Sequence, residues 1–396
     1  MRLVSRPALE PVAMLDFARQ YAPMREEILE AIARVCDSQG FILGPEVEAF
    51  ETAAAATCGA SFAVGCASGT DALWLAMASA GIGSNSVSGD RTDVVITSPF
   101  SFFASASAVL RAGARPVFAD IDPRTFNLSA DAVAEVLRGE SEERVRAILP
   151  VHLYGQCADF DALGEIAQSR DMPMIEDAAQ AFGATWNGRP AGSLGTAAAF
   201  SFYPTKNLGA MGDAGLVTTS DEQIAARVRS LRSHGMTRRY YHDEVGWNAR
   251  MDAIQAAVLS VKLRYLEGWN AERRNKAARY DELFRGAGLA AKNSVADGVV
   301  LPWRDSRAEH IFHQYVIRAP RRDALREYLT ELGIGSEIYY PVPLHLQDAL
   351  AELGYRQGDF PEAEAAAREV IALPMYPELR DDEQDAVVQA IRTFYA

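Results

Sequence analysis

The sequence predicts an α/β fold with a mostly parallel sheet and a second, smaller domain. Between residues 62 and 219, short β-rich runs alternate with helical runs, and this alternation is typical of parallel strands joined by crossover helices. The chain has 396 residues, which exceeds one typical domain. Hydrophobic residues make up 49% of it, enough for a sizeable core.

The elements follow from this pattern in chain order. Residues 21–57 have a helical pattern that is interrupted at Gly40 and at the Gly44-Pro45 pair, after which residues 46–56 form a second helix. Strands are predicted over residues 62–65, 94–98, 116–119, 147–151, 174–176, 198–201 and 215–219, with helices over 70–80, 105–112, 130–137 and 160–169. Residues 83–93, which are polar and glycine-rich, are predicted to form a surface loop.

The C-terminal part is predicted to form the smaller domain. One long helix over residues 251–284, with a break near Gly268, leads out of the large domain. A strand over 313–317 and a helix over 322–332 follow it. We place the boundary near residue 270, so that residues 1–270 form the large domain and residues 271–396 the small one.

Composition excludes several classes of protein. The net charge of −14 argues against a nucleic-acid binder, because a phosphate backbone needs a basic face. No apolar stretch is long enough for a transmembrane helix, and the N-terminus lacks the apolar core of a signal peptide. The four cysteines form no C-x-x-C pair and have no metal-ligand spacing, so we expect no metal site and a cytoplasmic protein with reduced thiols.

One lysine is unusual in its setting. The chain has 39 basic residues, of which only Lys206, Lys262, Lys276 and Lys292 are lysines. Lys206 lies in the apolar, glycine-rich run FSFYPTKNLGAMGDAGLV, after a predicted strand. Lysine becomes an amine nucleophile when desolvation lowers its pKa, whereas arginine does not lose its proton in proteins. An exposed loop lysine is the alternative interpretation, but the setting favours a functional residue.

A lysine that binds pyridoxal 5′-phosphate (PLP) as a Schiff base needs further groups. A carboxylate must keep the pyridine nitrogen protonated, and Asp177 fits because it ends the apolar strand in MPMIEDAAQ, where α/β folds place ligands. A helix N-cap aspartate is the alternative interpretation of Asp177. The turn from Ser68 to Thr70 opens a predicted helix whose free N–H groups favour a phosphate, although these residues are also ordinary caps. Ser201 is a candidate phosphate donor, and Phe102 is a candidate for stacking on the ring.

Seven segments together carry a family resemblance. They are CASGTDAL (66–73), SPFSFFASA (98–106), DIDPRTFNL (120–128), PVHLYGQCADFDAL (150–163), IEDAAQAFGA (175–184), FSFYPTKNLGAMGDAG (200–215) and GWNARMDAIQAAVL (246–259). From about residue 44 to about residue 347 the chain strongly resembles the DegT/DnrJ/EryC1/StrS family of PLP-dependent sugar aminotransferases. The resemblance implies the aspartate-aminotransferase-like (type I) fold and a homodimer with shared active sites.

The resemblance also implies roles for single residues. It makes Lys206 the Schiff-base and proton-transfer residue, and it pairs Asp177 with the pyridine nitrogen. The other implied cofactor contacts are Gln180 at the O3′ side, Gly69, Thr70 and Ser201 at the phosphate, Phe102 on the ring, and Asn248 reaching the phosphate of the neighbouring subunit's site. The implied substrate residues are Arg250, Tyr339, Tyr340 and His345. Many relatives have histidine at the position of Tyr339, so the sugar contacts there differ.

The function that the resemblance implies is amino-group transfer. We expect the donor to be L-glutamate and the acceptor to be a keto carbon of a nucleotide-diphosphate hexose. The segments HGMTRRYYHDEVGWNARMD and YYPVPLHLQ favour C3. A C4-aminating relative is the first alternative. A sugar dehydratase, which has histidine in place of the Schiff-base lysine, and a non-catalytic regulator are weaker alternatives, because the chain keeps Lys206 and Asp177.

Overall fold

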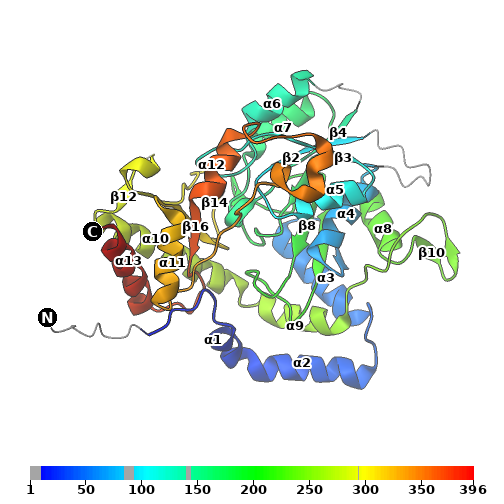
Figure 1. The fold of residues 1–396 in the computed structure, drawn as a ribbon. Coiled ribbons are helices and arrows are strands. Elements are labelled where there is room, and N and C mark those ends of the chain that lie inside the picture. The colour runs from blue at the N-terminus through cyan, green and yellow to red at the C-terminus, as the bar shows by residue number, and fades with distance from the viewer. Residues whose placement is uncertain (1–9, 84–92, 140–143, 293) are drawn as a thin grey trace.

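The computed structural model describes residues 10–83, 93–139, 144–292 and 294–396. The chain forms a large α/β part and a smaller C-terminal part that lie side by side (Figure 1). Of the predicted loop over residues 83–93, all but the two ends fall outside the described residues. Those two ends are held together, because the backbone N–H of Gly83 donates a hydrogen bond to the Asp93 carboxylate (2.8 Å).

The large part is built on one central run of strands. These strands are β1 (Phe62–Cys66), β2 (Val94–Thr97), β3 (Arg115–Phe118), β4 (Val145–Leu149), β5 (Ile175–Asp177), β8 (Ala197–Ser201) and β9 (Gly215–Thr219). They pair in the orders β3-β2-β4 and β5-β8-β9-β1. Parallel bridges from Ile148 to Met174 and from Val151 to Asp177 connect the two groups. The predicted strands and the fold class are therefore confirmed.

One strand of this run departs from the parallel arrangement that the alternation implied. β9 pairs antiparallel with both β8 and β1. The reason lies in the connection, because β8 and β9 are joined by residues 202–214 without a crossover helix, and an antiparallel pair needs none. The connecting residues 202–214 include Lys206, so the segment with the candidate lysine lies where a parallel connection would have a helix.

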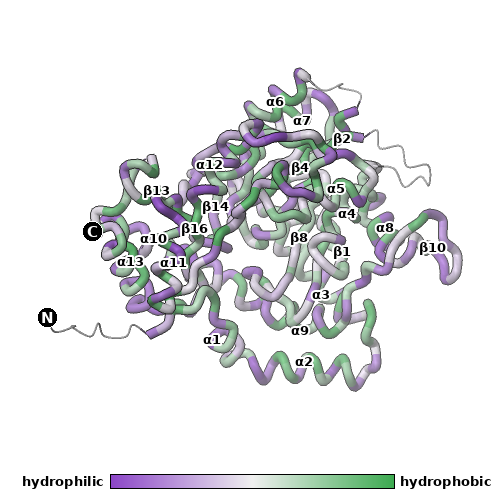
Figure 2. The backbone as a smooth tube through the Cα atoms, viewed as in Figure 1, coloured by the Kyte–Doolittle hydropathy of each residue, from purple (hydrophilic) through white to green (hydrophobic). Residues whose placement is uncertain are grey.

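Helices pack around the sheet or on one another. They are α1 (Phe17–Tyr21), α2 (Arg25–Ser38), α3 (Pro45–Cys58), α4 (Gly69–Ser79), α5 (Ala104–Arg111), α6 (Ala130–Gly139), α7 (Phe160–Gln168), α8 (Glu222–Leu231) and α9 (Ala253–Leu263). The predicted break between α2 and α3 is confirmed: Gln39 has a positive φ of 56°, and Pro45 is the first residue of α3. Figure 2 shows hydrophobic residues through the region of α3, α4 and α5, and hydrophilic ones along the arm that carries β10 (Met236–Arg238) and β11 (Tyr241–His242).

The predicted helix over residues 251–284 is two helices, and the predicted position of the break is wrong. α9 ends at Leu263, and α10 (Leu266–Gly286) begins two residues before Gly268, which lies inside α10. The break falls where Arg264 and Tyr265 both bind Glu27 of α2. A glycine inside a helix is destabilising by about 1 kcal/mol, which is not enough to end a helix that is held by packing.

The small part is an α/β layer of its own. Its sheet has the order β12-β13-β15-β16, and α10, α11 and α13 lie beside it (Figure 1). The elements are β12 (Ala290–Ala291), β13 (Val299–Val300), β15 (Tyr315–Arg318), α11 (Arg322–Glu331), α12 (Pro361–Glu369), β16 (Val370–Leu373) and α13 (Asp381–Tyr395). Short elements complete the fold: η1 (Ala22–Met24), η2 (Leu153–Gly155), β6 (Thr185–Trp186), β7 (Arg189–Pro190), η3 (Val295–Asp297), β14 (Ala308–Glu309), η4 (Leu344–Leu346) and η5 (Asp348–Leu353).

The cores of the two parts meet along α10. Leu266 packs in a hydrophobic cluster of the large part, whereas Ala277, Tyr280 and Phe284 pack in a cluster of the small part. Val12 near the N-terminus belongs to the small cluster as well. The boundary near residue 270 stays a prediction. In the described part of the chain, no helix combines the length and apolar character that crossing a membrane requires.

Candidate active site

The carboxylate of Asp177 lies at the centre of the site. Asp177 is the last residue of β5 and is 4% exposed. It pairs with Ala199 of the parallel strand β8, so the ends of both strands meet at one edge of the sheet. In the described structure no helix begins at Asp177, so an N-cap role does not account for its position. Burial raises the pKa of the carboxyl, while the hydroxyl of Ser105, the N–H of Ala179 and the charge of Lys206 act in the opposite direction.

Lys206 approaches the same edge from the chain that follows β8. A turn, closed by the hydrogen bond from Lys206 N–H to the carbonyl of Tyr203 (2.8 Å), leads to it. Burial lowers the pKa of Lys206 to about 8, and the negative charge of Asp177 opposes this shift. The lysine and the aspartate therefore lie near enough to influence one another. An amine that loses its proton readily and lies close to a buried carboxylate is the arrangement that Schiff-base chemistry requires.

Lys262 has a lowered pKa too, but its environment differs. Burial lowers the pKa of Lys262 to about 8, with Glu378 opposing the shift. Its ammonium group donates a hydrogen bond to the carbonyl of Gly209 from within α9. A lowered pKa alone does not identify the reactive lysine, and the neighbouring carboxylate Asp177 distinguishes Lys206.

The start of α4 forms a cradle beside these residues. Ser68 is the N-cap, and its hydroxyl accepts a hydrogen bond from the N–H of Asp71 (3.1 Å). The first-turn N–H groups of Gly69 and Thr70 have no acceptor within the helix, as at any helix start. A Cβ placed on Gly69 would lie 2.5 Å from Cβ of Ser201 and 2.9 Å from its hydroxyl oxygen. Gly69 and Ser201 therefore approach so closely that only glycine fits at position 69, and the group of N–H and O–H donors fits a phosphate.

Aromatic and amide groups line the other side. Phe102 is 59% exposed, and its ring centroid lies 6.3 Å from that of Tyr340. Gln180 is fixed at both ends of its amide: its oxygen accepts from the N–H of Tyr154 (2.7 Å), and its nitrogen donates to the hydroxyl of Tyr340 (3.0 Å). The hydroxyl of Tyr154 donates to the carbonyl of Tyr339. Phe102, Gln180 and both predicted tyrosines thus form one contact network.

The predicted residues of the 246–259 segment run beside the cradle. Arg250 forms a backbone bridge with Cys66, and Ala67 N–H donates to the carbonyl of Ala249 (3.0 Å). The side chain of Arg250 forms no hydrogen bond or ion pair with the residues that the structure describes. Asn248 is exposed and pairs through its backbone with Ser233. No described contact joins Asn248 to Lys206 of its own chain.

His345 lies in a different environment. It is buried on η4, its Nε2 atom is 3.1 Å from Oε1 of Glu364, and its ring packs against Phe360. Phe360 belongs to a hydrophobic cluster against which Tyr339 and Tyr340 also pack. Among the described residues, no hydrogen bond joins His345 to Lys206 or Asp177, and its role in substrate binding stays a prediction.

Several polar residues of the site were missed by the sequence analysis. Ser105 donates to Oδ2 of Asp177 (2.7 Å), and the hydroxyl oxygen of Ser101 lies 2.8 Å from that of Ser105. Asn207, next to Lys206, contacts Nδ1 of His313 (3.1 Å). Burial and the nearby cations Lys206 and Arg273 hold the pKa of His313 well below its usual range. The four-residue spacing of the two serines was a usable signal, but nothing in the sequence places His313 beside Lys206.

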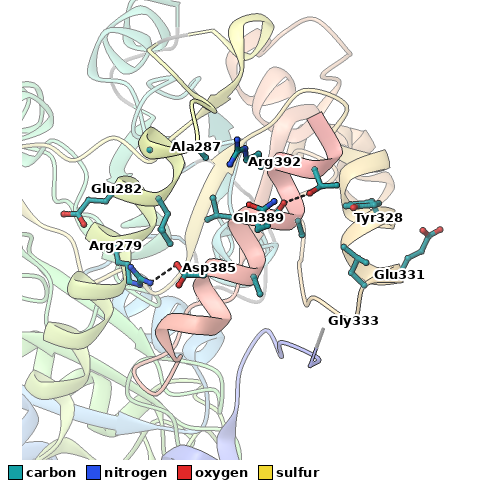
Figure 3. A pocket seen from close by; sticks show the side chains of 16 residues that line it. Arg279, Glu282, Ala287, Tyr328, Glu331, Gly333, Asp385, Gln389 and Arg392 are labelled. Atoms are coloured by element: carbon teal, nitrogen blue, oxygen red, sulfur yellow. Dashed lines mark hydrogen bonds and ion pairs between the residues drawn. The ribbon is translucent and has the colours of Figure 1, made fainter. Parts of the chain in front are cut away.

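A separate cavity lies in the small part. A hollow of about 1030 Å³ lies between α10, α11 and α13 (Figure 3). Its lining includes Tyr328, Leu332 and the ion pair between Arg279 and Asp385 (2.7 Å). It contains none of the predicted site residues, so cavity size does not locate the site in this single chain.

Comparisons with known proteins agree with this geometry. The model of the DegT/DnrJ/EryC1/StrS aminotransferase family matches residues 23–392. A "pleiotropic regulatory protein" of Geobacillus stearothermophilus is 47% identical, over 97% of this chain and 98% of that protein. A UDP-N-acetyl-3-dehydro-alpha-D-glucosamine 3-aminotransferase of Acidithiobacillus ferrooxidans is 40% identical, over 96% and 97%. The crystal structure of S. venezuelae DesV in complex with a ketimine intermediate superimposes with a TM-score of 0.90 at 41% identity, over 98% and 99%.

The length and strength of these matches bear out the predicted family. The family model spans nearly the whole chain, and the DesV structure covers 98% of it with a TM-score of 0.90. The glycine-lined cradle beside Ser201 fits the phosphate of the cofactor. The chain therefore belongs to the DegT/DnrJ/EryC1/StrS aminotransferase family and is a PLP-dependent sugar aminotransferase of the aspartate-aminotransferase-like (type I) fold.

Proposed function

We propose that the protein transfers an amino group from L-glutamate to the C3 keto carbon of a nucleotide-diphosphate sugar. The observation that carries the proposal is the pairing of Lys206, whose pKa is lowered to about 8, with the buried carboxylate of Asp177 beside the Gly69 cradle. The name of the A. ferrooxidans relative, a 3-aminotransferase of a 3-dehydro sugar, supports C3.

Each residue of the site has a task in this proposal. When bound, PLP supplies an electron sink that stabilises negative charge on the carbon that loses a proton. The lowered pKa of Lys206 leaves a fraction of its amine neutral near pH 7, which suits it both to attach the cofactor and to carry that proton. Asp177 holds a proton on the pyridine nitrogen through its charge. Donors at Gly69, Thr70 and Ser201 hold the phosphate.

The remaining contacts orient the cofactor and the sugar. Phe102 offers an exposed ring for stacking, and Gln180 keeps one amide hydrogen free for the O3′ oxygen after donating the other to Tyr340. We assign Arg250, Tyr339, Tyr340 and His345 to the nucleotide-sugar side. The guanidinium of Arg250 has no hydrogen-bond or ion-pair partner among the described residues, so it suits a phosphate or sugar oxygen.

We further propose a homodimer with shared sites, acting in the cytoplasm. Asn248 is exposed in the single chain, and it lies at the base of an arm with exposed Tyr240, Tyr241 and Trp247. Exposed apolar residues of this kind favour a partner surface. Under this proposal Asn248 reaches the phosphate in the partner's site.

The test is a panel of acceptors. Purified protein loaded with PLP is incubated with glutamate and with UDP- and dTDP-linked 3-keto and 4-keto hexoses, and NMR locates the new amine. Amination at C3 is expected. Amination only at C4 would select the alternative, and no amination of any keto sugar would contradict the proposal. Lys206→Arg is the matched control and should be inactive, because the guanidinium does not become neutral.

A further inference from the structure

Two serines lie directly behind the carboxylate that faces the cofactor. Ser105, in the first turn of α5, donates to Oδ2 of Asp177 at 2.7 Å. The hydroxyl oxygen of Ser101 lies 2.8 Å from that of Ser105. The exposed fractions are 3% for Ser101, 1% for Ser105 and 4% for Asp177. The three groups thus form a chain shielded from water, where hydrogen bonds are strong and an unpaired group is costly.

The chain of hydrogen bonds has one direction when Asp177 is ionised. A carboxylate only accepts hydrogen bonds, and a serine hydroxyl has one hydrogen to donate. Ser105 gives its hydrogen to Asp177, so its contact with Ser101 requires Ser101 to be the donor. Both hydroxyls therefore point their hydrogens toward the negative charge.

The same bonds fix which oxygen is left for the cofactor. Oδ2 is held by Ser105, whereas Oδ1 accepts only a long bond from the N–H of Ala179 (3.3 Å) among the described residues. We propose that Ser105, oriented by Ser101, is a positioning residue that keeps Asp177 ionised and presents Oδ1 to the pyridine nitrogen. This inference rests on the role proposed above for Asp177.

Other groups around Asp177 do not replace this function. Lys206 after β8 favours the ionised carboxylate by its charge, and His152 after β4 lies nearby as well. Burial and the charge of Asp177 raise the pKa of Tyr340 in the small part. The His152 ring, however, is 3.1 Å from Glu176, and its other nitrogen accepts from Ala158 N–H. Attaching PLP uses the Lys206 amine, so its free ammonium group is no longer available to Asp177. Ser105 is then the remaining side-chain donor to Asp177 among the described residues.

The test compares two cofactors that differ only at the ring nitrogen. Dissociation constants of the apoprotein are measured for PLP and for 1-deaza-PLP, in which a carbon replaces that nitrogen. The ratio of the dissociation constant for 1-deaza-PLP to that for PLP reports the contact between Asp177 and the nitrogen without any catalytic turnover. We expect Ser105→Ala to weaken PLP about tenfold, as the loss of a hydrogen bond to a charged group predicts, and to change the binding of 1-deaza-PLP by less than about twofold.

Three further variants make the result specific. Ser105→Thr keeps the hydroxyl and should keep the ratio near that of the wild type. Ser101→Ala should lower the ratio by a smaller factor than Ser105→Ala does. It also tests the proposed hydrogen bonds from Ser101 through Ser105 to Asp177 if Ser105→Ala fails to fold. Ser107→Ala, in the same helix and partly buried, is the matched control and should leave the ratio unchanged.

The outcomes separate this inference from the proposed function. If Asp177→Asn abolishes the preference for PLP but Ser105→Ala leaves the ratio unchanged, the positioning role is refuted and the role of Asp177 stands. If Asp177→Asn also leaves the ratio unchanged, the proposed contact between Asp177 and the ring nitrogen is itself refuted. A ratio that falls for Ser107→Ala as much as for Ser105→Ala would show a general effect of α5 and would overturn the inference.

Discussion

The titration of Lys206 in the apoprotein is the prediction that the site geometry defines best. Two opposing influences set it: burial lowers its pKa to about 8 from the ordinary 10.5, and the negative charge of Asp177 raises it. Replacing Asp177 by asparagine removes the charge but keeps the shape. Because the influence that raises the pKa is lost while burial remains, the pKa of Lys206 should fall below 8 in Asp177→Asn.

The magnitude is large enough to measure. With a pKa of about 8, about one Lys206 amine in ten is neutral at pH 7, whereas about one in three thousand would be neutral at the ordinary value of 10.5. The neutral amine is the nucleophile, so the reactivity of Lys206 at pH 7 should exceed that of an ordinary lysine by roughly 300-fold, apart from differences in access.

Competitive acetylation of the apoprotein across pH 6–11, read by peptide mass spectrometry, measures this fraction. The reactivity of Lys206 should rise tenfold per pH unit below its midpoint and level off above about 8. Lys262 is an internal control, since the pKa of its buried amine is also about 8 but its charged neighbour is Glu378. Asp177→Asn should move the midpoint of Lys206 and leave that of Lys262 in place. A midpoint of Lys206 near 10.5, or one that does not move in the variant, would refute the reasoning.

Three other changes test other parts of the site. Gly69→Ala should weaken PLP binding at least about fivefold, because the new methyl group lies 2.5 Å from Ser201 and overpacking costs about 1–3 kcal/mol. Gly268→Ala is the control, because the space around Gly268 is open, and it should leave the dissociation constant for PLP unchanged. Equal effects of the two changes would contradict a phosphate site at Gly69. Arg250→Ala should impair the sugar half-reaction and largely spare the conversion of PLP by glutamate, as stopped-flow absorbance can show; equal damage to both would remove it from the sugar side. Asn248→Asp and Lys206→Ala should each be inactive. If the active sites are shared, exchange of subunits between the two variants should restore roughly a quarter of wild-type activity. No recovery, with subunit exchange confirmed by a tag, would exclude shared sites.

The parts of the fold that depend on local pattern could be predicted from the sequence. Strand and helix positions follow from periodicity, and the break before Pro45 follows from its chemistry. The direction of β9 could not be read from alternation alone, although the missing helix between residues 201 and 215 was a signal for it. The break before α10 coincides with the contacts of Arg264 and Tyr265 with Glu27, more than 230 residues away along the chain.

The residues of the site also divide into those that local sequence patterns predict and those that depend on distant contacts. Lys206, Asp177 and the Gly69 turn lie in segments whose residue types are themselves distinctive. The contact between Ser105 and Asp177 joins residues 72 positions apart, and that between Asn207 and His313 joins residues 106 apart. Such contacts depend on how strands and helices stack, which no local pattern encodes. For His345, the resemblance implied a substrate contact, which stays a prediction; the structure adds that the ring lies against Glu364 and Phe360.

Borohydride reduction of the PLP-loaded protein tests the central claim most directly. Two lysines have a pKa lowered to about 8, so the lowered pKa leaves both Lys206 and Lys262 as candidates, and the nearby Asp177 and the glycine-lined cradle select Lys206. After reduction, removal of free cofactor and digestion, mass spectrometry should find the added pyridoxyl phosphate on the peptide that contains Lys206. Attachment at Lys262, Lys276 or Lys292 instead, or at no lysine, would contradict the account.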